Sequence, residues 1–168
     1  MFYRFLAYTR FLFRSTNQHG VHSPFVYQYV TKGLYRNSRF KGSKTAKVAL
    51  KSLEYFEVGN IDLEESKHGL DAQVKSHFPA IKRNRMPYDF IYHPRPELKS
   101  VRNLLDTPGK IHNDTLLLLD QPYRNPQSTK EWESIKEIPG VTVTIDMFHC
   151  SAVFFRKEQV KEHFRIRI

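Results

Sequence analysis

Asp120 is the residue whose setting in this sequence is most like that of a functional group. It ends the run Thr115 to Asp120, in which four consecutive leucines stand between the threonine and the aspartate. An almost wholly apolar run of this kind is typical of a parallel strand covered by helices on both faces. Such sheets place ligand-binding groups at the carboxyl ends of their strands, so Asp120 is a candidate catalytic residue. A structural cap of a turn or helix is the alternative role for a lone carboxylate there.

Histidine and cysteine side chains offer fewer combinations. His93 closes the apolar run that starts at Tyr88, and its place resembles that of Asp120. His19 and His22 share a polar loop without a nearby carboxylate or thiolate, so we expect hydrogen-bonded structural histidines and no metal site. Cys150 follows His149 directly, but adjacent residues of a strand point to opposite faces, which disfavours a Cys/His pair.

Other catalytic motifs do not occur in the sequence. There is no Gly-x-Ser-x-Gly nucleophile elbow and no Gly-x4-Gly-Lys-Ser/Thr phosphate loop. One cysteine excludes an internal disulfide. No apolar run approaches the roughly 20 residues of a membrane span, and the arginines of the first segment do not suit a signal peptide. We therefore expect a cytoplasmic protein without a transmembrane segment.

Basic residues are concentrated in the first third of the chain. Residues 1–53 contain ten Lys or Arg and no Asp or Glu, whereas the rest of the chain holds 17 residues of each sign. The whole net charge of +10 therefore belongs to this third. Such asymmetry attracts anionic partners, including nucleic acid, acidic lipid or the acidic face of another protein. A solvated basic face without a partner is the alternative.

The elements that must position these residues alternate between helix and strand. The hydrophobic spacing predicts helices at residues 2–13, 24–34, 44–56, 70–78, 97–105 and around Trp132 to Ile138. It predicts strands at 88–92, 115–120, 141–146 and 152–155, with a short strand candidate at 61–63 and an edge-strand alternation at 165–168. We expect a basic loop at 80–87 and a short helix or turn at 158–164. Ser23 is the expected N-cap of the second helix, with Pro24 at its first position. The last two apolar runs before residue 156 suit an antiparallel hairpin with a five-residue loop.

The first helix has two possible uses. Phe2, Phe5, Leu6 and Phe13 fall at spacings that a helix brings together, with arginines between them. An amphipathic helix normally docks its apolar face on the body of the protein. A basic amphipathic helix can instead lie at a membrane surface.

Local stretches of the sequence resemble a small family of class I S-adenosylmethionine-dependent methyltransferases with an N-terminal helical extension. The similar pieces, in the same order along nearly the whole chain, are residues 16–25, 45–48, 88–91, 111–114, 132–135, 141–146 and 153–157. The resemblance implies a Rossmann-like sheet and S-adenosylmethionine as cofactor. It also implies a site residue after the 88–92 strand, where His93 stands in place of an aspartate. A pair of acids is implied after the next strand, where Asp120 is followed by Gln121.

The cofactor-binding part of that family pattern is missing from the sequence. The family begins its sheet with a strand, a glycine-rich turn and a helix, followed by a second strand that ends in an acid for the ribose. Close backbone approach to a ligand requires glycines, but the seven glycines here are scattered singly. We therefore expect an incomplete α/β sheet of about four to five strands with a C-terminal antiparallel hairpin. The expected division is a basic aromatic helical extension over residues 1–36 and a truncated methyltransferase-like domain over residues 44–168.

Three functions follow from these patterns. The first is a methyltransferase-related protein that has lost competent cofactor binding and persists as a non-catalytic remnant, or as a partner of a second copy or an intact relative through exposed sheet edges. The second is a basic module whose arginines, lysines and aromatic rings bind nucleic acid. The third is an active methyltransferase whose site is completed by oligomerisation.

Overall fold

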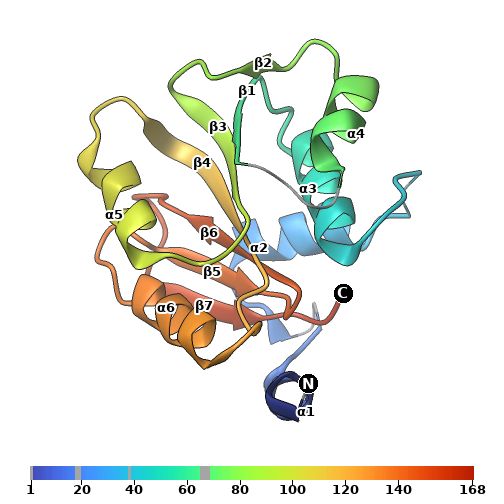
Figure 1. Ribbon diagram of the computed structural model, residues 1–168, viewed down its shortest axis with the longest axis vertical. Coiled ribbons are helices and arrows are strands. Elements are labelled where there is room, and N and C mark those ends of the chain that lie inside the picture. The colour runs from blue at the N-terminus through green and yellow to red at the C-terminus, as the bar shows by residue number, and fades with distance from the viewer. Residues whose placement is uncertain (1, 18–19, 38, 65–68) are drawn as a thin grey trace.

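The protein folds as a sheet between two layers of helices (Figure 1). The structure is a computed structural model that describes residues 2–17, 20–37, 39–64 and 69–168. Its helices are α1 (Phe2–Arg14), α2 (Pro24–Gln28), the π-helix η2 (Tyr29–Leu34), α3 (Lys44–Tyr55), α4 (Leu70–His77), α5 (Leu98–Asp106) and α6 (Pro126–Lys136). Its strands are β1 (Asn60–Leu63), β2 (Lys82–Arg83), β3 (Tyr88–His93), β4 (Ile111–Asp120), β5 (Val143–Asp146), β6 (Cys150–Phe154) and β7 (Glu162–Arg165).

The sheet is mixed, and its strands are ordered β2-β1-β3-β4-β6-β5-β7. Strands β2, β1, β3 and β4 run parallel, whereas β6 is antiparallel to both of its neighbours. Strands β5 and β7 pair in parallel and run in the direction of β4, so β6 alone has the opposite direction among the seven strands of the described residues. The expected α/β class and the antiparallel pairing of the 141–146 and 152–155 segments are thereby confirmed.

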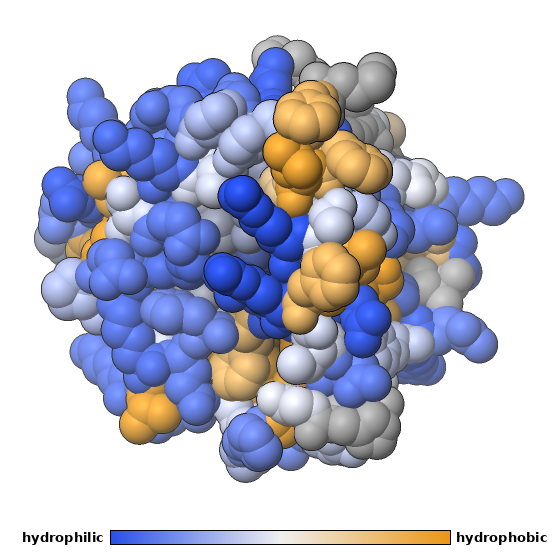
Figure 2. Space-filling view, turned by 90° about the horizontal axis from the view of Figure 1, so that it is seen from below, coloured by the Kyte–Doolittle hydropathy of each residue, from blue (hydrophilic) through white to orange (hydrophobic). Residues whose placement is uncertain are grey.

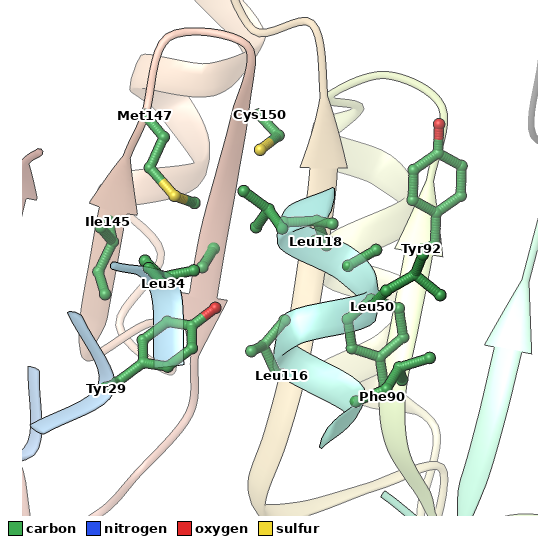
Figure 3. Packing of buried hydrophobic residues seen from close by; sticks show 14 of the residues in the cluster. Tyr29, Leu34, Leu50, Phe90, Tyr92, Leu116, Leu118, Ile145, Met147 and Cys150 are labelled. Carbon is green, nitrogen blue, oxygen red and sulfur yellow. The ribbon is translucent and has the colours of Figure 1, made fainter. Parts of the chain in front are cut away.

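The leucines of β4 divide the core into two layers, as the alternation of side chains along a strand requires. Leu116 and Leu118 belong to the cluster beneath α2, η2, α3 and α4, and Figure 3 shows them near Leu50 of α3. Leu117 and Leu119 belong to the cluster beneath α5 and α6. All four β4 leucines are at most 1% exposed, so this strand holds both helical layers on the sheet.

The N-terminal segment packs on the same core as the sheet. Ser23 caps α2 by accepting a hydrogen bond from the amide of Val26, as the sequence predicts. Tyr29 of η2 is fully buried, and its hydroxyl lies 2.6 Å from that of Ser52 on α3. Residues 20–36 therefore contribute side chains to the larger core cluster.

The strand count expected from the sequence, four to five, is too low. Lys82 and Arg83 form the short strand β2 in a stretch expected to be a loop, and β7 begins at Glu162, where a helix or turn was expected. The hairpin loop has three residues rather than five, because β6 already starts at Cys150. Phe148 in this loop has a φ of 65°, the left-handed conformation that a short hairpin loop needs.

Neither edge of the sheet is a long, bare apolar strand. At one edge β2 has two residues, both basic. At the other edge Thr16 bridges to Ile166: the amide of Thr16 donates to the carbonyl of Arg165 (2.8 Å), and that of Arg167 donates to the carbonyl of Thr16 (3.2 Å). Short, charged or covered edges discourage strand addition by another chain. Pairing with a second copy or a relative through these edges stays a prediction.

Candidate functional site

The strands β1, β3, β4 and β5 share one direction, so their carboxyl ends lie along the same side of the sheet. We call this side the carboxyl edge. The helices that follow β1 and β3 lie on opposite faces: α4 packs in one core cluster and α5 in the other. Such a reversal between neighbouring strands opens a crevice in which α/β proteins bind ligands. The polar residues at this edge are therefore the candidate site.

Asp120 is held by side chains of two other elements. Its Oδ1 accepts a hydrogen bond from the hydroxyl of Thr45 on α3 at 2.7 Å, and its Oδ2 accepts one from the hydroxyl of Tyr92 on β3 at 3.2 Å. The side chain of Gln121 also contacts Oδ2, at 3.4 Å. The residue is 2% exposed. Asp120 thus ties β4 to β3 and α3, and its carboxylate faces the protein interior.

His93 and Glu64 meet at the crevice between β3 and β1. The Nδ1 of His93 lies 3.0 Å from Oε1 of Glu64, which immediately follows β1. Burial lowers the pKa of His93, whereas the nearby carboxylates of Glu64 and Asp62 raise it. Burial outweighs the carboxylates because the Glu64 side chain is half exposed, so solvent screens its charge. His93 is therefore neutral at pH 7 and donates an Nδ1–H hydrogen bond to Glu64.

A third polar cluster surrounds Asp146, a residue that the sequence analysis did not select as functional. Its buried carboxylate accepts hydrogen bonds from the hydroxyl of Tyr123 and from the amide of Phe148 (2.9 Å), and the Nε of Arg165 lies 3.9 Å away. Burial raises the pKa values of both Asp146 and Tyr123. Asp146 ends an apolar strand as Asp120 does, which is the sequence feature that singles it out. The side chains around it, Tyr123 and Arg165, come from distant segments, so no local pattern predicts the cluster.

The remaining histidine and cysteine predictions concern separate places. His22 is exposed in the loop before α2, and His19 lies outside the described residues. Cys150 is fully buried, and burial raises the pKa of its thiol, which disfavours a reactive thiolate. Burial also lowers the pKa of His149, with Lys44 and Arg4 acting in the same direction.

Two further properties of the described residues bear on the site. Within residues 2–17, 20–37, 39–64 and 69–168, no group of three or more His, Cys, Asp or Glu side chains is arranged to hold a metal ion. None of the helices in these ranges has the length and apolar character needed to cross a bilayer.

Comparisons with protein-family models, with curated proteins and with solved structures found no match.

The contacts of Asp120 predict that replacing Thr45 by valine destabilises the protein. Valine has nearly the shape of threonine but no hydroxyl, so the buried carboxylate loses its shortest side-chain hydrogen bond. We expect a loss of about 1–3 kcal/mol in the free energy of unfolding, measured by urea denaturation. Thr107→Val is the matched control, because its exposed hydroxyl donates only to a backbone carbonyl. Equal stability of Thr45→Val and the parent protein would show that Thr45 does not hold Asp120.

The lowered pKa of His93 predicts a loss of stability in mild acid. The unfolded chain binds a proton at a pKa of about 6.5, whereas the folded protein binds it only at lower pH. The stabilisation is thus present above pH 6.5 and is lost as the pH falls toward the folded pKa. Thermal unfolding between pH 7.5 and 5 measures this loss, and His93→Gln should reduce it. The pKa values of His149 and His163 are also lowered, so part of the acid-dependent loss of stability should remain in the variant.

Glu64→Gln is the companion variant in the acid experiment. It removes a carboxylate that raises the pKa of His93, so the folded pKa falls further and the acid loss becomes larger. A smaller loss than in the parent protein would contradict the assigned balance between burial and charge.

Proposed function

We propose that the protein is related to class I S-adenosylmethionine-dependent methyltransferases and acts without a competent cofactor site. The observation that carries this proposal is the contact between Glu64 and His93 at the carboxyl ends of β1 and β3. A crevice of this kind is where α/β sheets hold their ligands. Here its two polar side chains satisfy each other, and the histidine is 8% exposed.

The glycine nearest the end of β1 does not support a close approach of backbone to ligand. Gly69 follows Leu63 by six positions and precedes α4 with a φ of 61°. A Cβ added to Gly69 would meet no atom within 4 Å. A glycine at this position is therefore explained by its left-handed backbone conformation at the start of α4. A glycine that cradles a ligand instead permits close contact that a side chain would block.

The second strand also departs from what the cofactor requires. The strand beside β1 does not replace the missing ribose-binding acid, because β2 ends in Arg83. The guanidinium of Arg83 pairs with Asp71 on α4, which fixes it to a neighbouring helix. A cation in this position offers no acceptor to a hydroxyl pair. The residues present at the ends of β1 and β2 thus do not fit the cofactor.

Asp120 completes the case for a structural role of the carboxyl edge. Methyl transfer requires the donor and the acceptor to be held in line within about 3–3.5 Å. Asp120 is directed toward Thr45 and Tyr92 inside the protein, and this leaves it poorly placed to orient either reactant. We infer that Asp120 has a structural role.

Cofactor binding is the direct test of this proposal. Titration calorimetry with S-adenosylmethionine and with S-adenosylhomocysteine should give no saturable heat up to about 1 mM ligand, which corresponds to binding weaker than about −4 kcal/mol. An intact class I methyltransferase under the same conditions serves as the positive control. Micromolar binding that disappears in His93→Ala would overturn the proposal.

The alternative of an enzyme completed by oligomerisation is tested in the same preparation. Light scattering gives the oligomeric state, and a radiolabelled methyl donor with candidate acceptors reports turnover. Turnover that rises with protein concentration would favour this alternative. The short β2 and the bridge of Thr16 at the end of β7 argue against assembly by strand pairing.

A specific surface favours nucleic-acid binding as a second candidate function. Lys44, Lys47 and Lys51 lie three and four residues apart on one side of α3, and with Arg167 they line a groove of about 370 Å³. The groove has no carboxylate side chain among its lining residues in the described part of the chain. Burial and the neighbouring Lys47 lower the pKa of Lys51. Such a row of cations complements the regularly spaced phosphates of a nucleic-acid backbone.

The double variant Lys47→Ala/Arg167→Ala tests this second candidate. Both side chains are exposed, so the fold should be unchanged. Fluorescence anisotropy with a labelled oligonucleotide over a salt series should show weaker binding and a slope of log K against log salt reduced by about 1–2. Lys99→Ala/Lys130→Ala removes the same charge from exposed positions on α5 and α6 and should change binding less. Equal losses in both variants, or no binding by the parent protein, would exclude the groove.

A further inference from the structure

Helix α1 turns its apolar side away from the protein. Residues 2, 5, 6, 9 and 13 recur at spacings of three and four and therefore share one side of the helix. All of them except Thr9 are Phe or Leu. An amphipathic helix that only supported the core would face the opposite way.

The exposed fractions confirm this orientation. Phe2, Phe5 and Phe13 are 76%, 65% and 87% exposed, and Leu6 and Leu12 are each 39% exposed. Figure 2 shows the underside of the molecule, where α1 lies in Figure 1, with apolar side chains gathered beside strongly hydrophilic ones. Five large apolar side chains are thus exposed on one short helix, a concentration that soluble monomers rarely show without a function.

The other side of α1 holds the helix on the hairpin loop. Phe11 is the buried residue of this helix, and its ring centroid lies 5.6 Å from that of Phe148. The ring of Tyr8 lies 4.8 Å from the same phenylalanine in an edge-on arrangement, and the Arg4 guanidinium stands 5.9 Å from its centroid. The helix is thus docked through one narrow side, and this contact leaves the Phe and Leu side free.

Charge identifies the kind of surface that fits this helix. Arg10 and Arg14 are exposed and lie one helical turn apart on α1. Residues 1–53 contain no Asp or Glu. A second copy of the chain would bring the same positive charge to the interface, so self-association is disfavoured. An anionic bilayer accepts the rings and leucines at the boundary between headgroups and acyl chains, while arginines reach the lipid phosphates. Each basic residue near such a surface contributes about 1 kcal/mol.

We propose that α1 is an interfacial membrane anchor that inserts Phe2, Phe5 and Phe13 into a bilayer containing anionic lipid. The helix lies in the plane of the surface and does not cross the membrane. This inference does not depend on whether the carboxyl edge binds a cofactor, because that edge contributes no residue to the Phe and Leu side of α1.

Sedimentation of the full chain with lipid vesicles tests the proposal. Binding to phosphatidylcholine mixed with phosphatidylglycerol should be at least tenfold tighter than to phosphatidylcholine alone, in keeping with the arginine contribution. Phe5→Gln/Phe13→Gln should reduce binding at least tenfold, because the variant loses the apolar contacts of two rings. The matched control is Met86→Gln/Val160→Gln, which removes exposed apolar side chains elsewhere and should bind normally.

A fluorescence measurement identifies the partner. In Phe5→Trp the new indole is exposed, whereas the native Trp132 is fully buried and supplies a constant background. Anionic vesicles should shift the emission to shorter wavelength, and a single-stranded oligonucleotide should not. The proposal fails if vesicles leave the emission unchanged, if the oligonucleotide produces the shift, or if the control variant loses binding equally. It also fails if the shift occurs with protein concentration alone, since this would identify a second copy as the partner.

Discussion

The burial of β4 on both faces is the constraint on which the rest of the structure depends. Its four leucines are removed from water only if helices cover both sides of the sheet, and each buried leucine contributes about 1.5–3 kcal/mol. The strand also pairs in parallel with β3 on one side and antiparallel with β6 on the other, so it joins the two parts of the sheet. The helices α3 and α6 therefore both shield β4 leucines from water, and they do so on opposite faces of the sheet.

The strand also brings a carboxylate to the point where its apolar run ends. Asp120 cannot remain buried without hydrogen-bond donors, since an unpaired buried charge is strongly destabilising. Thr45 and Tyr92 provide these donors and at the same time fix α3 and β3 to the end of β4. The same solution recurs at Asp146 with Tyr123. Both carboxylates thus accept hydrogen bonds from side chains of other segments at the ends of their strands.

Features with a local cause were predictable from the sequence, and those with a distant cause were not. The leucine run of β4, the hairpin of β5 and β6, and the cap at Ser23 each depend on neighbouring residues. The strand β2 has two basic residues and no alternation, so only its pairing with β1 reveals it. The contact between Glu64 and His93 joins residues that are far apart in the chain. For α1 the sequence predicted an amphipathic helix, but the side that docks is chosen by Phe148, which a single sequence does not connect to Phe11.

The bridge between Thr16 and Ile166 gives the first residues a further part in the architecture. Thr16 lies beside the end of β7 with two backbone hydrogen bonds, although it belongs to no strand of its own. A protease that trimmed the chain beyond this threonine would expose the carbonyl of Arg165 and the amide of Arg167 to another molecule. Thr16 therefore protects the end of β7 against pairing with another chain, and it ties the residues that follow α1 to the sheet.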